Sequence, residues 1–254
     1  MDTRSLARHW EIDAARGIAI GMMIVYHAAF NLATFGDFPI EPLGTFWRTF
    51  SHATAASFIF LAGLALTLSH ARATRGGTRP PGLWRQYLLR GARIFNWGLA
   101  ITLVTWQLFP QAPIIFGILH LLGLSIPLAY PLLRLRFANL ALGAGFLLLG
   151  LALRDITLDT PWLVWLGLQP TGFTSLDYRP LVPWFGVLLL GVFVGNTLYT
   201  RSERSGLPIG RDRPALAAPL ALLGRHSLAI YLIHQPLLLA LLWALGLIDL
   251  GFLF

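Results

Sequence analysis

The sequence predicts an all-α integral membrane protein, a polytopic bundle of about seven transmembrane helices with its N-terminus in the cytoplasm. Hydrophobic residues make up 56% of the 254 residues and charged residues only 12%. A soluble core does not need so many apolar residues, so the surplus is expected to face lipid. A membrane-spanning helix needs roughly 17–25 apolar residues. Seven segments approach or meet this length, at about 14–35, 48–70, 88–108, 113–133, 137–153, 183–200 and 220–246.

The distribution of arginine orients these segments. All 19 of the Lys and Arg residues are Arg, and most lie at the start of the first segment or around the links after the second, fourth and sixth. The other side has only Arg48, Arg154 and Arg179. Because basic residues concentrate in cytoplasmic loops, the N-terminus is predicted in the cytoplasm and the end of the seventh span outside. We expect a single domain over residues 1–254.

Charge and composition exclude several classes of protein. The net charge of +8 would suit a nucleic-acid partner, but the basic residues alternate with membrane spans and form no aromatic-studded basic domain. The absence of Cys excludes disulfides, thiolate metal ligands and a cysteine nucleophile. No two histidines lie three or four residues apart with a carboxylate partner, so no metal site is expected.

The first span carries polar side chains along one side. At 100° per residue, Arg16 and His27 differ by only about 20° around the helix axis, and Asp13 and Asn31 lie within about 60° of Arg16. A polar face on a membrane helix is costly in lipid, so it should face the protein interior or a wet cavity. This face is the first candidate for a functional site.

Two further histidines lie inside predicted spans. His120 enters the fourth span from outside and lies at a depth similar to that of His27, roughly 10–12 Å from the outer end at about 1.5 Å per residue. His234 lies near the middle of the seventh span. An intramembrane His can take part in chemistry or simply hydrogen-bond across helices. His27, with its polar neighbours, is the favoured functional residue, and both roles stay open for the other two.

The outer side offers candidates for binding a ligand. The loop at about 154–182 is long, and loops of this length without a full element are often functional. It contains Asp177 and Tyr178, which can line an entrance from outside. Trp184 follows at the outer end of the sixth span, a position that an aromatic belt also explains.

Five segments, taken in order, resemble one family. Arg16, ten residues and then His27 resemble the signature of transmembrane acyltransferases that modify cell-surface glycans. More closely, nearly the whole chain resembles the bacterial heparan-alpha-glucosaminide N-acetyltransferase catalytic-domain-like family. The segments that carry this resemblance are 11–27, 58–63, 116–120, 180–186 and 223–236.

The resemblance implies an acyltransferase in the plasma (inner) membrane of a bacterium, surrounded by lipid and compatible with a homodimer. Such an enzyme takes an acetyl or short acyl group from cytosolic acyl-CoA, here acetyl-CoA. It delivers the group to a hydroxyl or amine of a glycan-like acceptor on the far side. A thioester is already activated, so the enzyme needs a base for the acceptor's proton. His27 is the first candidate for this base and His120 the second.

The remaining expected site residues fall into two groups. Arginines on the cytoplasmic side can hold the phosphates of the donor, and these are Arg16, Arg90, Arg93 and Arg225. Arg16 lies roughly 16 Å from His27 along the helix, which is comparable to an extended pantetheine arm. Polar and aromatic groups toward the outer side are expected to bind or orient the acceptor, and these are Asn31, Asp177, Tyr178, Trp184 and His234.

The alternative is a non-enzymatic transporter of a small anionic metabolite. A polar helix face with intramembrane Arg and His also describes a permeation path. Many secondary transporters, however, show internal repeats and paired broken helices, and the sequence shows neither. The acyltransferase is therefore the favoured interpretation.

Overall fold

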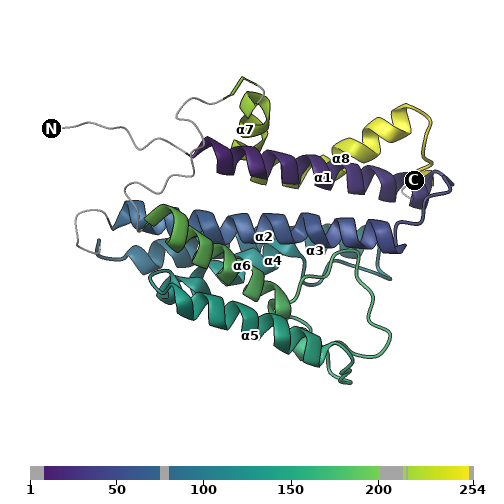
Figure 1. Cartoon of the computed structure of the whole chain (residues 1–254). Coiled ribbons are helices and arrows are strands. Elements are labelled where there is room, and N and C mark those ends of the chain that lie inside the picture. The colour runs from purple at the N-terminus through teal and green to yellow at the C-terminus, as the bar shows by residue number, and fades with distance from the viewer. Residues whose placement is uncertain (1–8, 75–79, 201–213, 216, 252–254) are drawn as a thin grey trace. The chain divides into compact units, whose positions relative to one another are not determined.

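The protein is built from helices, as the sequence predicts (Figure 1). The computed structural model describes residues 9–74, 80–200, 214–215 and 217–251, and these residues contain no β-strand. The α-helices are α1 (Trp10–Phe35), α2 (Thr45–Ala73), α3 (Leu83–Leu108), α4 (Ile118–Ala129), α5 (Phe137–Leu153), α6 (Leu181–Gly195), α7 (Ala217–Arg225) and α8 (Ser227–Ala244). The short turns of other helix types are η1 (Tyr130–Leu132), η2 (Pro161–Leu163) and η3 (Asn196–Thr200).

Within the described residues, four helices are long and apolar enough to cross a bilayer: α1, α2, α6 extended to Tyr199, and α8. The segments Ile118–Leu132 and Phe137–Leu153 are apolar but shorter. The helix α3 has 26 residues, but Arg85, Arg90 and Arg93 lower the hydropathy of its first half. The protein is an integral membrane protein, while a count of seven spans stays a prediction.

Two expected spans differ in the structure. The segment predicted at 220–246 is divided, because α7 ends at Arg225 and α8 begins at Ser227, with His226 outside helical geometry at ψ 18°. Gly224, His226 and Ser227 all have low helix propensity, which favours a break here. The segment predicted at 113–133 becomes helical only at Ile118.

The chain forms two compact units. Unit 1 comprises Met1–Phe58 and Pro208–Phe254, and unit 2 comprises Ile59–Leu207. In unit 1, α1 packs against α7 and α8. In unit 2, α3 packs against α4, α5 packs against α6, and α4 also contacts α6 (Figure 1). A single domain over the whole chain stays a prediction.

Glycines let helix backbones approach closely in both units. In unit 1, a Cβ on Gly17 would clash with the Leu220 carbonyl of α7. In unit 2, a Cβ on Gly63 of α2 would clash with the Leu188 carbonyl of α6, and one on Gly191 of α6 with the Phe60 carbonyl of α2. Small residues at helix crossings are typical of membrane proteins, because packing rather than the hydrophobic effect holds such helices together.

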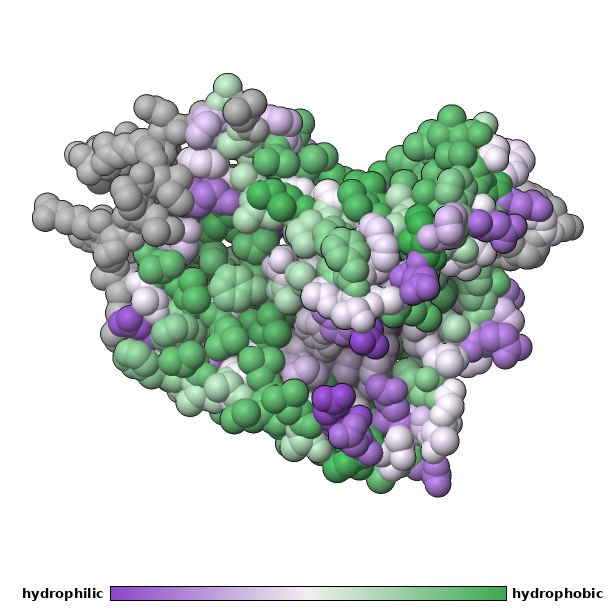
Figure 2. All heavy atoms as spheres, turned by 45° about the vertical axis from the view of Figure 1, so that its right-hand side comes forward, coloured by the Kyte–Doolittle hydropathy of each residue, from purple (hydrophilic) through white to green (hydrophobic). Residues whose placement is uncertain are grey.

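Large apolar side chains cover much of the surface in view (Figure 2). Leu103, Leu148, Leu151 and Trp243 are among the exposed ones, with exposed fractions of 56–70%. A soluble monomer rarely exposes wide apolar surfaces, and lipid is the environment that suits them.

The crossing of α2 and α6 yields a prediction about stability. Gly63→Val should destabilise the protein by about 1–3 kcal/mol, the usual cost of overpacking a close contact, since the neighbouring carbonyl belongs to a helix backbone and cannot move aside. Unfolding in detergent, followed by tryptophan fluorescence, measures the loss. Gly145→Val in α5 is the matched control, because nothing lies within 4 Å of a Cβ at that position. Equal stability of the two variants would contradict the proposed close packing.

Candidate functional site

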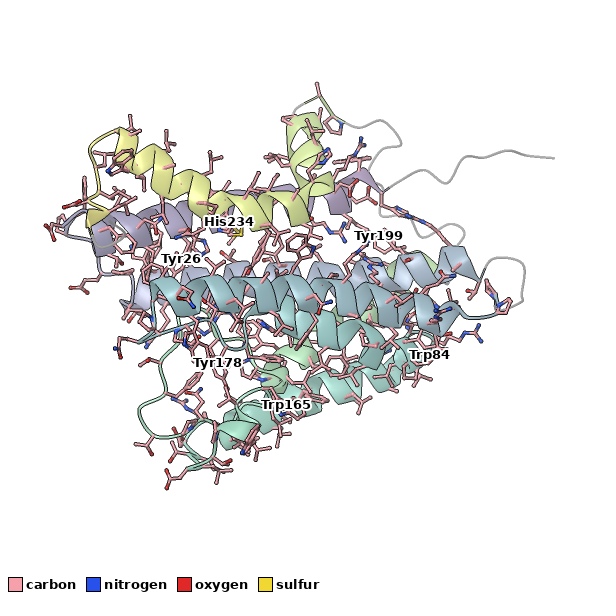
Figure 3. All side chains as sticks on the ribbon, turned by 180° about the vertical axis from the view of Figure 1, so that it is seen from behind. Tyr26, Trp84, Trp165, Tyr178, Tyr199 and His234 are labelled. Carbon is pink, nitrogen blue, oxygen red and sulfur yellow. The ribbon has the colours of Figure 1, made fainter. Side chains whose placement is uncertain are left out.

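His27 of α1 has a histidine partner on α8. The ring centroids of His27 and His234 are 4.8 Å apart, and the two planes are inclined by 70°. His234 is buried, with an exposed fraction of 8%, and Figure 3 shows it on α8. Because the two histidines are 207 positions apart in the sequence, the sequence could not reveal that they form a pair.

The hydrogen bonds of the two imidazoles determine which nitrogen of each can act as a base. Nδ1 of His27 lies 2.9 Å from the Met23 carbonyl oxygen, and Nδ1 of His234 lies 2.7 Å from the Tyr231 carbonyl oxygen. A carbonyl only accepts, so each Nδ1 must carry the proton that is donated. In the neutral ring Nε2 then has the lone pair, and both histidines present a basic nitrogen away from their own helix.

An amide pair lies on the same two helices. Gln235 Nε2 donates to Asn31 Oδ1 at 2.8 Å, and Asn31 is completely buried. Among the described residues, Asn31 Nδ2, Gln235 Oε1 and His234 Nε2 are buried without a hydrogen-bond partner. Each such atom costs about 1–3 kcal/mol when left unsatisfied. His27, Asn31, His234 and Gln235 form what we call the His–amide cluster. Besides His27 Nε2, these buried atoms offer one donor group and two acceptors to a polar ligand.

A buried carboxylate lies at the other end of α1. Asp13, with 3% of its surface exposed, forms ion pairs with Arg16 of α1 (Nη1–Oδ1 3.9 Å) and with Arg225 of α7 (Nε–Oδ2 3.6 Å). The close packing of Gly224 on the Asp13 backbone brings α7 to this position. Both arginines were expected to hold the donor. A guanidinium has five N–H donors, so pairing with Asp13 still leaves each of them able to bind a phosphate.

The side chain of His120 is buried among residues of unit 2. Its exposed fraction is 2%, and the Gly117 backbone N–H donates to its Nδ1 at 3.2 Å. Nε2 must then carry the proton, and it lies 3.3 Å from the hydroxyl oxygen of Thr102. The ring packs on Phe95 and Phe116. Since the lone pair is used to cap the start of α4, this geometry favours a structural role. A catalytic role for His120 stays a prediction.

Asp177 and Arg179 join the loop at 154–180, which is predicted on the outer side, to α4. Asp177 Oδ2 accepts from the Ile118 N–H at 3.1 Å, and Asp177 Oδ1 lies 3.6 Å from Arg179 Nε. A carboxylate at a helix N-terminus is favourable because it meets the positive end of the helix dipole. The Arg179 guanidinium also lies over Trp184, with Cζ 5.3 Å from the ring centroid. Asp177 and Trp184 therefore contribute to loop structure, and their expected role in acceptor binding remains a prediction.

Tyr178 connects two parts of the same loop through its side chain (Figure 3). Its hydroxyl donates to the Val164 carbonyl at 2.7 Å, and Phe173 packs against its ring. Burial raises the pKa of Tyr178 to about 12, although a hydrogen bond with Gln169 opposes the increase. Tyr178 is therefore neutral at physiological pH and can serve only as a hydrogen-bonding group.

Arg90 and Arg93, both expected to bind the donor, are exposed on α3. Within the residues the structure describes, no group of three His, Asp or Glu side chains could hold a metal ion.

Sequence reasoning missed Gln235 and the pairing of Asp13 with Arg225. The position of Gln235 in a membrane-spanning helix, beside His234, was an available signal, because an amide there needs a partner. The Asp13–Arg225 pair had no such signal, since more than 200 residues separate the two and neither is unusual at a helix end.

A family model described as "Heparan-alpha-glucosaminide N-acetyltransferase, catalytic" matches residues 8–236. This range includes all four members of the His–amide cluster as well as Asp13, Arg16 and Arg225. Comparisons with curated proteins and with solved structures gave no match.

The ion pairs of Asp13 yield a prediction about stability. Asp13→Asn should lower the free energy of unfolding by about 1 kcal/mol, because the buried carboxylate loses its ion pairs with two partly exposed guanidinium groups. Denaturation in detergent, monitored by circular dichroism, measures this. Asp37→Asn is the control, because Asp37 is exposed and has φ 53°, a conformation that Asn tolerates well. An equal effect of both substitutions would contradict a special role for Asp13.

Proposed function

From the premise that the chain belongs to the heparan-alpha-glucosaminide N-acetyltransferase catalytic family, and is therefore a membrane acetyltransferase, we propose its donor, its base and its class of acceptor. The donor is cytosolic acetyl-CoA. The acceptor is a hydroxyl or amine of a glycan or a related molecule on the extracytoplasmic side. The base is His27. The orientation of the two imidazoles in the His–amide cluster is the observation that supports this proposal most strongly.

The proposed chemical step begins with the acceptor. Its O–H or N–H donates to His27 Nε2, and its heteroatom attacks the thioester carbonyl while the proton passes to the ring. The tetrahedral intermediate collapses, the C–S bond breaks, and the CoA sulfur leaves with the proton returned by the imidazolium. The His27 Nδ1–H stays on the Met23 carbonyl throughout, so the hydrogen bond also stabilises the positive ring.

The other members of the cluster support this step. Two imidazolium charges with centroids 4.8 Å apart would repel strongly, so His234 is expected to stay neutral while His27 is protonated. Its Nε2 and Gln235 Oε1 can then accept hydrogen bonds from the acceptor. Asn31 Nδ2 is a donor suited to the developing oxyanion, the kind of group that typically contributes several kcal/mol in acyl transfer.

The donor is proposed to lie along α1. Arg16 is eleven residues from His27, roughly 16 Å at 1.5 Å per residue. Phosphates near Arg16 and Arg225 therefore allow a thioester near His27, in one extended pose. Arg90 and Arg93 remain further candidates for the phosphates.

A transporter of a small anion is the rival function, because intramembrane Arg and His also suit a permeation path. The fixed orientation of two neutral imidazoles favours proton transfer over ion passage. Binding without any acetyl transfer would favour the rival.

His27→Asn should lower acetyl transfer about 10²- to 10⁴-fold, the usual effect of losing a general base, while acetyl-CoA binding persists. Asn keeps a hydrogen-bonding group of similar reach but is not basic. Release of free CoA thiol by the protein in membranes measures transfer. His226→Ala is the control, because His226 is exposed and makes no side-chain cap bond. His120→Gln tests the second candidate. If His27→Asn retains normal turnover and His120→Gln does not, the base is His120.

Arg16→Gln should weaken acetyl-CoA binding by about tenfold or more, since a hydrogen bond to a charged group contributes about 1.5–3 kcal/mol. The increase in unfolding temperature produced by acetyl-CoA measures this affinity. Arg154→Gln is the matched control, because Arg154 is exposed and pairs with Asp155. If acetyl-CoA protects Arg16→Gln against unfolding as well as it protects the wild type, Arg16 does not bind the donor, and its ion pair with Asp13 is structural.

A further inference from the structure

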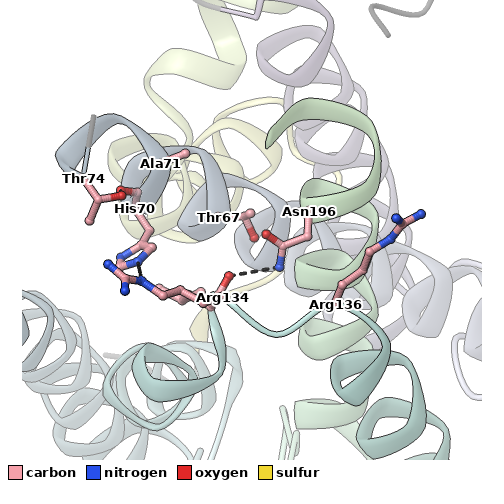
Figure 4. Close-up of a pocket in the computed structure, with 8 residues that line it drawn as sticks. Thr67, His70, Ala71, Thr74, Arg134, Arg136 and Asn196 are labelled. Atoms are coloured by element: carbon pink, nitrogen blue, oxygen red, sulfur yellow. Dashed lines mark hydrogen bonds between the residues drawn. The ribbon is translucent and has the colours of Figure 1, made fainter. Parts of the chain in front are cut away.

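Unit 2 contains a polar pocket of about 210 Å³ that no function described above uses (Figure 4). Three chain segments form it: the C-terminal end of α2, the link between η1 and α5, and the end of α6. The lining residues are Thr67, His70, Ala71, Thr74, Leu133, Arg134, Arg136 and Asn196. The arginine distribution predicts that all three segments lie on the cytoplasmic side.

The pocket is positively charged. Arg134 and Arg136 line it, and none of its lining residues is acidic. Figure 4 shows the two arginine side chains extending in opposite directions, Arg134 toward His70 and Arg136 away from it. In the part of the chain that the structure describes, neither arginine forms an ion pair with Asp or Glu. Guanidinium groups without a neutralising carboxylate favour binding of an anion such as a phosphate group.

The neutral donors of the lining already have acceptors within the protein. The Thr67 hydroxyl donates to the Gly63 carbonyl at 3.2 Å and the Thr74 hydroxyl to the His70 carbonyl at 3.0 Å. Asn196 Nδ2 donates to the Leu133 and Leu135 carbonyls at 3.0 and 3.1 Å. A ligand would therefore be recognised mainly by the guanidinium groups.

Each guanidinium is held in place through Nε. Arg134 Nε donates to His70 Nε2 at 3.4 Å, and Arg136 Nε donates to the Thr197 hydroxyl oxygen at 3.0 Å. His70 itself is buried and packs against the rings of Tyr87 and Tyr130. Anchoring through Nε orients the terminal Nη groups, which are the donors that bind phosphate oxygens in pairs.

The volume limits what can enter. Pockets that enclose a drug-sized ligand measure about 300–1,000 Å³, and one water occupies about 30 Å³ of liquid. At about 210 Å³ the pocket is smaller than such enclosed sites, and it has room for one or two phosphate groups.

We propose that this pocket binds the phosphate or diphosphate group of a ligand that is present on the cytoplasmic side. The phosphates of a coenzyme and the head group of an anionic phospholipid share this chemistry. The proposal does not depend on acetyl transfer at His27, and its test requires no turnover.

The test uses inorganic pyrophosphate as the probe on the purified full chain in neutral detergent, at constant ionic strength. Pyrophosphate should raise the unfolding temperature of the wild type, because a ligand that binds only the folded state stabilises it. Arg134→Gln should raise the half-saturating concentration about 10- to 100-fold. Arg72→Gln is the matched control: Arg72 is exposed on the last turn of α2 and is not among the residues that line the pocket.

Should Arg134→Gln fail to fold, Arg136→Gln tests the same site and leaves the hydrogen bond between Arg134 and His70 intact. Displacement of pyrophosphate by CoA would identify a coenzyme as the source of the phosphates. Displacement by phosphatidylglycerol, but not by phosphatidylcholine, would identify an anionic lipid as the source. The proposal is overturned if pyrophosphate does not protect the wild type. It is also overturned if Arg72→Gln loses as much affinity for pyrophosphate as the pocket variants do. The same holds if Arg134→Gln and Arg136→Gln lose stability but keep their affinity for pyrophosphate.

Discussion

A polar side chain inside a bilayer has to find its hydrogen-bond partners within the protein, because hydrocarbon supplies none. The arrangement of unit 1 follows from this constraint. His27, Asn31 and Asp13 lie on α1 and would be costly in lipid, and α7 and α8 cover them with His234, Gln235 and Arg225. The same residues that make α1 expensive as an isolated span therefore determine which helices it packs against.

The same constraint separates the histidines by role. His27 and His234 each donate from Nδ1 to a carbonyl of their own helix, which leaves Nε2 directed away from that helix. His120 instead accepts a backbone N–H at Nδ1, so its basic lone pair is already used. His27 and His120 have similar predicted depths in the membrane, and the polar neighbours of His27 made it the first candidate; hydrogen bonding now also distinguishes the two.

Much of this arrangement could be predicted from the sequence, and the parts that could not share a physical reason. The all-helical membrane fold follows from composition and apolar segment lengths, and the polar face of α1 follows from the 100° helical repeat. The partners of that face lie about 200 residues away, and no local pattern encodes a contact over such a separation. The helix break at His226 and the pocket at Arg134 were also not predicted from the sequence, because both depend on how helix ends meet in space.

The glycine contacts of α1 have a consequence for how unit 1 can move. Gly17 meets the Leu220 backbone and Gly224 meets the Asp13 backbone, so no flexible side chain separates the two helices at these points. Sliding α1 by a single residue would bring a larger side chain against the Leu220 backbone in place of Gly17, where there is no room for it. It would also move the Asp13 backbone away from Gly224. Small adjustments along the helix axis are thus blocked, and only one alignment allows Asp13 to reach Arg225. The two helices therefore have one permitted alignment along their axes, so any opening of unit 1 has to move α1 and α7 together as one body.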